Sequence, residues 1–292
     1  GTSAVAGMLE RAGAYLGEER ELLPAHTHDN PTGYWERADV VSVNDALLDA
    51  SGYKWDRIAG LDPHRLSAKQ MRPTQHQIVA RLSRAGKPWL IKDPRLCLLL
   101  PQWLPLIECV ACIVVVRDPR EIAASMRDGP RGVFTSHYLI ALWEKYLRIA
   151  LGSLHGRPVI FIAYPAMLDE PEKQCKSLVS SLESLGIGGL HVPADTAIGD
   201  FLDLRLHRSR PKPHIQLSPK QQILLDWLFA RCKAAQPQVV ADVPEGDIPD
   251  EVLHEFEKAL AAQADRTRSE ALHQTAEQVQ KLESAVAQRS EE

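Results

Sequence analysis

The stretch VACIVVVRDPREIAASM, residues 110–126, decides the fold class. Its first part, VACIVVV, is apolar and mostly β-branched, which is typical of a strand that is buried on both faces. The charged residues that follow lead into an amphipathic segment, so we expect a strand, a short turn and a helix over residues 120–127. A strand that is followed by a helix rather than by a hairpin is the repeating unit of a parallel sheet.

Two more segments have the same character as residues 110–116. They are PWLIK at residues 88–92 and PVIFIA at residues 158–163, and each is followed by loop or helix signals. Helical periodicity between these segments predicts crossover connections, so we expect an α/β sandwich with a central parallel sheet. A further helix is predicted at the start of the chain, and others over residues 74–86, 136–153, 171–185 and 219–235.

The formal charge of −4 is unevenly distributed along the 292 residues. Residues 249–292 contain 5 Lys and Arg against 10 Asp and Glu, or −5, whereas residues 1–248 contain 29 against 28, or +1. A near-neutral body argues against a general nucleic-acid binder, which needs a basic face, but it leaves room for a local anion site. The sequence therefore predicts an α/β domain over 1–248 and an acidic helical or coiled-coil tail over 249–292, which could mediate self-association or partner binding.

The longest apolar run, residues 109–116, is far shorter than the roughly 20 residues of a membrane-spanning helix, so we expect a cytoplasmic protein without a transmembrane segment. Five irregularly spaced cysteines are typical of reduced thiols. Cys109 and Cys112 lie three apart in a predicted strand and would point to opposite faces, so they would not share a metal. His26, His28 and Asp29 have no third histidine at metal spacing, and no metal is expected.

Basic residues stand at the ends of two predicted strands. Lys92 ends the first strand and Arg117 follows the second, and ligands of α/β sheets bind beyond the carboxyl ends of strands. An arginine can fork onto a phosphate, while Ser125 in the next helix can donate a hydrogen bond from the same side. The structural alternatives are an ion pair between Arg117 and Asp118 and one between Lys92 and the acid beside it.

The chain opens with Gly1-Thr2-Ser3 directly before a predicted helix. Free N–H groups and hydroxyls at such a position bind anions, although a simple helix cap is the alternative. Glu36 follows the turn-rich loop HTHDNPTG at residues 26–33. It is either a first-turn acid that complements the helix dipole or a general base, and His28 is the rival candidate base.

In this order, these segments resemble the PAPS-dependent sulfotransferases, in particular bacterial members and the tyrosylprotein branch, over roughly residues 1–213. GTS at residues 1–3 is similar to the end of their 5′-phosphosulfate loop, and RDPREIAASM at 117–126 to their 3′-phosphate motif. KDPR at 92–95 is similar to a lysine-bearing segment of the tyrosylprotein enzymes. Tyr164 stands where a nucleotide-contacting tyrosine follows their third strand. The family's first strand and the basic residue before its SGT sequence have no counterpart, so we expect either a missing N-terminal segment or a degenerate phosphosulfate site.

The resemblance implies a P-loop NTPase-like three-layer fold and a sulfotransferase activity. The sulfuryl group of 3′-phosphoadenylyl sulfate (PAPS) would move to an acceptor hydroxyl without a metal, and adenosine 3′,5′-bisphosphate would be the product. Glu36 would accept the proton and Lys92 would stabilise the leaving oxygen. The implied nucleotide-binding residues are Gly1, Thr2 and Ser3 at the 5′-phosphosulfate, Arg117 and Ser125 at the 3′-phosphate, Tyr164, and Arg205, His207 and Arg208 closing over the nucleotide.

The acceptor and two alternative functions stay open. Aromatic and polar residues in the segment 52–73 suit a glycan or another small molecule, such as a phenol. One alternative is a P-loop-type nucleotide-dependent kinase, which would need Mg²⁺ and a P-loop lysine. The other is a non-catalytic assembly subunit with a vestigial nucleotide site, whose terminal helix recruits partners.

Overall fold

The sheet consists of two parallel strands and one short antiparallel strand. β1 (Cys112–Val116) runs parallel to β2 (Pro158–Ala163), and β3 (Gln238–Val239) pairs antiparallel with the start of β2. The α/β class is therefore confirmed. These observations come from a computed structural model, which describes residues 1–25, 33–108, 111–127, 134–193, 215–234, 236–246 and 249–290.

Residues 88–92, predicted as a strand, form no strand in this structure. The backbone there makes one isolated parallel bridge, between Trp89 and Tyr15. The N–H of Tyr15 donates to the carbonyl of Pro88 at 2.8 Å, and the N–H of Leu90 donates to the carbonyl of Tyr15 at 3.0 Å. An apolar run predicts burial but supplies no partner strand, and Pro88 has no N–H to donate. The prediction of this strand was wrong, and the observed sheet is mixed rather than wholly parallel.

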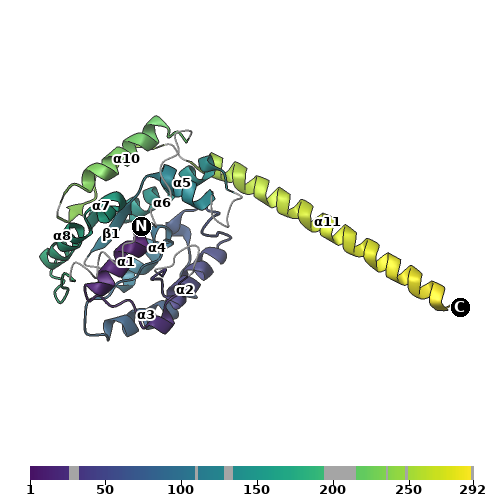
Figure 1. The fold of residues 1–292 in the computed structure, drawn as a ribbon, viewed down its shortest axis with the longest axis horizontal. Helices are drawn as coiled ribbons and strands as arrows, with labels where there is room; N and C mark the ends of the chain where they lie inside the picture. Colours follow the sequence, from purple (N-terminus) through teal and green to yellow (C-terminus); the bar gives the residue numbers. More distant parts are fainter. Residues whose placement is uncertain are drawn as a thin grey trace.

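Helices surround the sheet (Figure 1). Those predicted over 74–86, 120–127, 136–153, 171–185 and 219–235 are confirmed to within a few residues, whereas α4 and α7 were not predicted. Thr135 caps α6 by accepting a hydrogen bond from the N–H of Tyr138, as expected for a threonine at this position. The helices are α1 (Thr2–Arg11), α2 (Ala38–Asp49), α3 (Arg72–Ser83), α4 (Leu96–Trp103), α5 (Pro119–Arg127), α6 (Ser136–Ser153), α7 (Tyr164–Asp169), α8 (Pro171–Ser184), α10 (Pro219–Arg231) and α11 (Asp250–Ser290).

Both faces of the sheet are covered by helices. Side chains alternate along each strand, so Val115 and Ile162 share one face and pack into a cluster with residues of α1 and α8. Val116 and Phe161 face the other way and pack with residues of α6 and α10. The strand ends that carry the candidate site residues therefore emerge between helices of the two layers.

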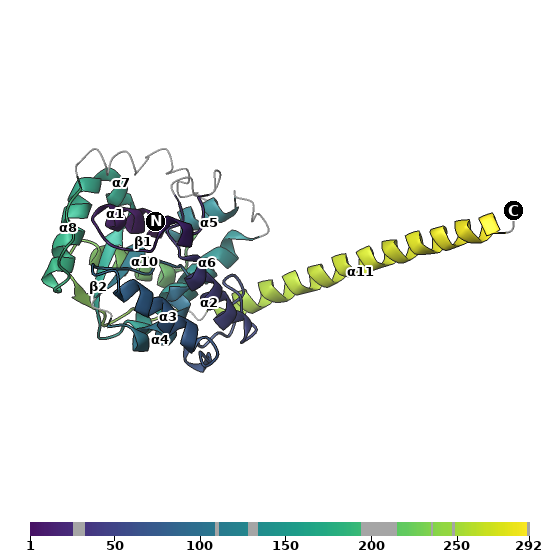
Figure 2. The same ribbon diagram turned by 90° about the horizontal axis from the view of Figure 1, so that it is seen from below.

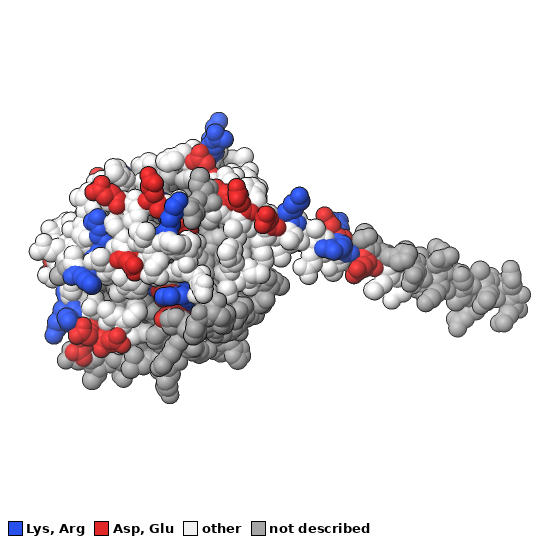
Figure 3. Space-filling view, turned by 90° about the horizontal axis from the view of Figure 1, so that it is seen from above, with Lys and Arg blue, Asp and Glu red and all other residues white. Residues whose placement is uncertain are grey.

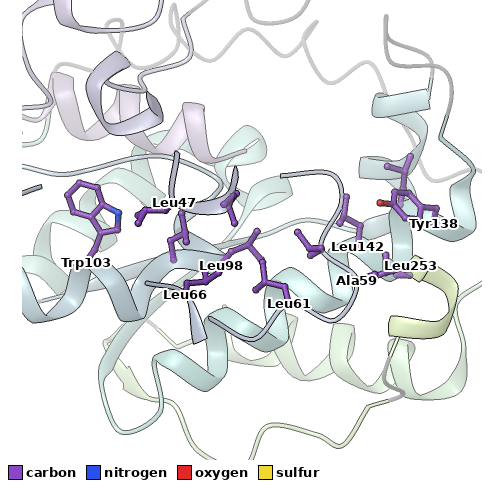
Figure 4. Packing of buried hydrophobic residues seen from close by; sticks show 14 of the residues in the cluster. Leu47, Ala59, Leu61, Leu66, Leu98, Trp103, Tyr138, Leu142 and Leu253 are labelled. Carbon is purple, nitrogen blue, oxygen red and sulfur yellow. The ribbon is translucent and has the colours of Figure 1, made fainter. Parts of the chain in front are cut away.

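Helix α11 begins in the core of the body and then leaves it (Figures 1 and 2). Leu253 is fully buried and lies near Leu142 of α6 and Ala59 (Figure 4). The carboxylate of Glu257 accepts a hydrogen bond from the N–H of Ala59 at 3.0 Å. Residues 261–268 are all exposed, so the projecting part of the helix starts after its first three turns.

The surface of the body carries charges of both signs. Acidic and basic side chains are interspersed over the face drawn in Figure 3, as the near-neutral charge of residues 1–248 predicts. Across the described ranges, no helix combines the length and the apolar character needed to cross a membrane.

Candidate functional site

The ammonium group of Lys92 lies at the centre of a buried polar cluster. Its Nζ atom donates to Oε1 of Glu36 at 2.5 Å, to the carbonyl of Tyr34 at 2.8 Å and to Oγ of Ser3 at 3.1 Å. The side chains of Lys92 and Glu36 are 8% and 9% exposed. Burial lowers the pKa of Lys92, although the charge of Glu36 opposes that shift. Three predicted site residues, Ser3, Glu36 and Lys92, are thus in one hydrogen-bonded group.

Three separate segments bring this cluster together. Ser3 lies in the first turn of α1, and Lys92 follows the bridge that ties its segment to Tyr15. Glu36 lies just before α2, and its backbone carbonyl accepts a hydrogen bond from the N–H of Leu23 at 2.8 Å. The cluster therefore depends on tertiary packing rather than on any one local motif.

The acid next to Lys92 supports the segment instead of pairing with the lysine. Asp93 accepts a hydrogen bond from the amide of Asn44 at 2.9 Å and from Nη1 of Arg95 at 3.0 Å. Arg95 also pairs with Asp45 at 2.6 Å. These bonds fix the residues after Lys92 to helix α2, so the carboxylate that pairs directly with Lys92 is that of Glu36.

Arg117 and Tyr164 lie side by side at the carboxyl ends of β1 and β2. Val116 is in register with Ala163, so the next residue of each strand emerges at the same edge. The guanidinium carbon of Arg117 lies 4.9 Å from the centroid of the Tyr164 ring, in a cation–π contact. The structure therefore makes neighbours of two residues that were predicted to bind the nucleotide.

Arg117 is also held by a buried acid. Its Nε atom donates to Oε2 of Glu121 at 3.0 Å, whereas Asp118 pairs with Arg120 at 2.6 Å. The alternative of an ion pair between Arg117 and Asp118 is therefore wrong. Within the part of the chain that the structure describes, the two Nη atoms of Arg117 make no hydrogen bond, so they can fork onto an anion.

Gly1 links the two halves of the site. The N-terminus lies beside β1 in both views of the ribbon (Figures 1 and 2), and a Cβ placed on Gly1 would be only 2.7 Å from the ring of Tyr164. The Tyr164 ring in turn contacts Arg117, and Ser3, two residues after Gly1, contacts Lys92. The two cations therefore act on a common space at the start of α1, where their fields favour an anion.

The other predicted site residues are not joined to this group. Thr2 is exposed in the first turn of α1, and Ser125 is exposed on α5 without a hydrogen bond to another described residue. His28, Arg205, His207 and Arg208 lie outside the described residues.

No protein-family model, curated protein or solved structure matches the chain.

Two contributors to the site were missed in the sequence. Tyr34 acts through its backbone carbonyl, which every residue type has, so no side-chain pattern could reveal it. Glu121 stands four residues after Arg117, across the first turn of α5. That spacing was a usable signal, because opposite charges four apart on a helix are neighbours.

Metal ligands do not gather in the described ranges. No group of three His, Cys, Asp or Glu there could hold a metal ion. The four cysteines of those ranges, Cys97, Cys112, Cys175 and Cys232, are free thiols. Burial raises the pKa of Cys97 and of Cys175 to about 11, which makes them poor nucleophiles and metal ligands at neutral pH.

Proposed function

We propose that the chain is a sulfotransferase that moves the sulfuryl group of PAPS to a hydroxyl of a glycan or another small molecule. One observation carries this proposal: a single buried lysine, Lys92, contacts both the hydroxyl of Ser3 at a helix start and the carboxylate of Glu36. A cation between an anion-binding helix start and a base is an arrangement that favours group transfer to a hydroxyl.

In the proposed reaction the acceptor oxygen attacks the sulfur atom of PAPS. A new bond forms between that oxygen and sulfur, and the bond between sulfur and the bridging oxygen of the 5′-phosphate breaks. Glu36 takes the proton of the acceptor hydroxyl, and Lys92 stabilises the negative charge that develops on the bridging oxygen. Because Nζ of Lys92 and Oε1 of Glu36 are 2.5 Å apart, the group that accepts the proton and the group that stabilises the developing charge are hydrogen-bonded to each other.

The residues around Arg117 fit a nucleotide with a second phosphate. Arg117 supplies two Nη donors for a 3′-phosphate, and Glu121 and Tyr164 hold its guanidinium group in place. A sheet with helices on both faces and a site beyond parallel strand ends is consistent with the finer expectation of a P-loop NTPase-like sandwich. The cations of this site neutralise the donor, so the reaction as proposed needs no metal.

We predict that Arg117→Ala weakens binding of adenosine 3′,5′-bisphosphate by about 10- to 100-fold, because a charged fork onto a phosphate contributes about 1.5–3 kcal/mol. Binding of adenosine 5′-phosphate should change by less than about 3-fold, since it lacks the second phosphate. Calorimetric titration of both nucleotides measures the difference.

Arg120→Ala is the matched control for Arg117→Ala. It removes the same charge three residues away, but Arg120 is engaged with Asp118 and should leave both affinities almost unchanged. If Arg117→Ala weakens the binding of both nucleotides equally, Arg117 does not bind the 3′-phosphate.

The proposed activity is tested by transfer of labelled sulfate from PAPS to glycan, phenol and peptide acceptors. We expect labelling of a glycan or another small molecule, and loss of that labelling when an excess of adenosine 3′,5′-bisphosphate is added. Absence of transfer to every acceptor, together with absence of bisphosphate binding, would refute the proposal.

Helix α11 favours a second candidate function, that of an assembly subunit. Its residues from 261 onward extend away from the body, and a helix without tertiary contacts is only marginally stable in water (Figure 2). A thin apolar stripe, Leu272, Val279, Leu282 and Val286, is spaced for helix pairing. Self-association of α11 would therefore stabilise it, with or without catalysis.

We predict that the full chain self-associates in solution, whereas a chain ending at residue 262 is a monomer. The shortened chain keeps Leu253 and the other core contacts of α11, so it should remain folded. Light scattering of both chains measures the masses. If both are monomers, self-association through α11 is wrong.

A further inference from the structure

Trp35 has a backbone conformation that bulky residues rarely adopt. Its φ is +62°, and within the described ranges the other non-glycine residue with positive φ is Asp242. The left-handed region costs about 1–3 kcal/mol for a residue of this kind, so the surrounding structure must impose it.

The two neighbours of Trp35 both bind the same ammonium group. The carbonyl of Tyr34 lies 2.8 Å from Nζ of Lys92, and Oε1 of Glu36 lies 2.5 Å from it. In an extended strand, a backbone carbonyl lies in the plane of the strand, whereas the side chain two residues further on stands roughly perpendicular to that plane, so the two groups point in different directions. The left-handed turn at Trp35 bends the chain so that an oxygen from each side converges on Lys92.

Contacts on both sides hold this turn in place. The indole packs against the cluster formed by α1 and α8, and the guanidinium carbon of Arg11 lies 5.6 Å from its ring centroid. On the other side Arg37 is 3% exposed, forms a bridge with Leu22 and pairs with Glu21 at 2.9 Å. These anchors supply the energy that keeps Trp35 in the strained conformation.

We propose that Trp35 is a positioning residue. Its left-handed backbone places the two oxygens that bind Lys92, the carbonyl of Tyr34 and Oε1 of Glu36, and so orients Glu36 and Lys92 toward the reacting groups. The catalytic part of this inference rests on the proposed sulfotransferase function. The geometric part, that the conformation of residue 35 determines the contacts of Lys92, rests only on the two hydrogen bonds of Lys92 and the positive φ of Trp35.

The experiment compares Trp35→Asn, Trp35→Gly and Trp35→Val. All three lose the packing of the indole, but glycine adopts positive φ freely, asparagine tolerates it, and the β-branched valine resists it. We expect the transfer rate of Trp35→Val to be about 5- to 100-fold below that of Trp35→Asn and Trp35→Gly, which is the rate equivalent of about 1–3 kcal/mol of strain. The affinity for adenosine 3′,5′-bisphosphate should be the same in all three.

A second readout does not depend on turnover. The titration of the Lys92 ammonium group is followed by NMR with labelled lysine, and the signal is assigned by its loss in Lys92→Arg. We expect the pKa of Lys92 in Trp35→Gly and Trp35→Asn to match the unmodified chain, and the pKa in Trp35→Val to be lower, since an ammonium group that loses oxygen acceptors is less stable in a buried site.

Equal Lys92 titration in the three variants would overturn the proposal. So would equal transfer rates, because the indole rather than the backbone would then be the important feature. If the unmodified chain transfers no sulfate, the proposed function fails, whereas the NMR comparison still decides the role of Trp35.

Discussion

Glu36→Gln should lower the rate of sulfuryl transfer by about 10²- to 10⁴-fold while the affinity for adenosine 3′,5′-bisphosphate stays the same. Glutamine keeps an oxygen that can accept the hydrogen bond from Lys92, so the cluster should hold its shape. It cannot take the proton of the acceptor hydroxyl at neutral pH. Single-turnover transfer assays and bisphosphate titration separate the two effects.

Glu144→Gln is the control for this substitution. Glu144 is also a buried acid in an ion pair, with Arg148 at 2.8 Å, but it lies on α6 rather than in the candidate site. It has no place in the proposed reaction, so its variant should transfer sulfate normally. Full activity of Glu36→Gln would contradict the role of Glu36 and would make His28 the base to test.

Lys92→Met should cost about 3–5 kcal/mol of the free energy of unfolding, because it leaves the carboxylate of Glu36 buried without its partner. The double variant Lys92→Met with Glu36→Leu should recover most of this loss, since a well-packed apolar pair is often as stable as a buried ion pair. Urea denaturation of both single variants and of the double variant measures the coupling. If the double variant loses as much stability as the two single variants together, Lys92 and Glu36 are not coupled.

The lowered pKa of Lys92 predicts that the stability of the folded chain depends on pH. Burial lowers the pKa of Lys92 in the folded chain below its usual value, so the unfolded chain binds that proton more tightly. Stability must then rise with pH between the folded pKa and the unfolded one. The free energy of unfolding of the unmodified chain, relative to Lys92→Met, should increase across that interval. A difference in the free energy of unfolding that does not change with pH would contradict the lowered pKa of Lys92.

The fold was predictable where a local pattern suffices. β2 and α6 were predicted with the observed bounds because an apolar run or a helical stripe defines each of them. Residues 88–92 have an equally good strand pattern but form one isolated β-bridge, with Tyr15, among the described residues, since pairing depends on which backbone lies alongside. β3 is two residues long and α4 contains Pro101, so neither has a pattern that indicates its structure.

Some residues of the candidate site stood out in the sequence, but most of their pairings did not. Lys92 and Arg117 stand out as cations at the ends of apolar runs, and both lie near the start of α1. The partner of Lys92, Glu36, is set by tertiary contacts, whereas Glu121 pairs with Arg117 through its local spacing of four residues in preference to the nearer Asp118. The strain at Trp35 has no signal in the sequence, because a tryptophan there gives no indication of a left-handed backbone.

Calorimetric titration of the chain with adenosine 3′,5′-bisphosphate, in parallel with adenosine 5′-phosphate and with ATP and Mg²⁺, tests the central claim most directly. A sulfotransferase site should bind the bisphosphate about 10- to 100-fold more tightly than the monophosphate, because Arg117 grips the second phosphate. It should bind ATP with Mg²⁺ more weakly than the bisphosphate. Tighter binding of ATP with Mg²⁺, or equal binding of the two adenosine phosphates, would contradict the sulfotransferase assignment.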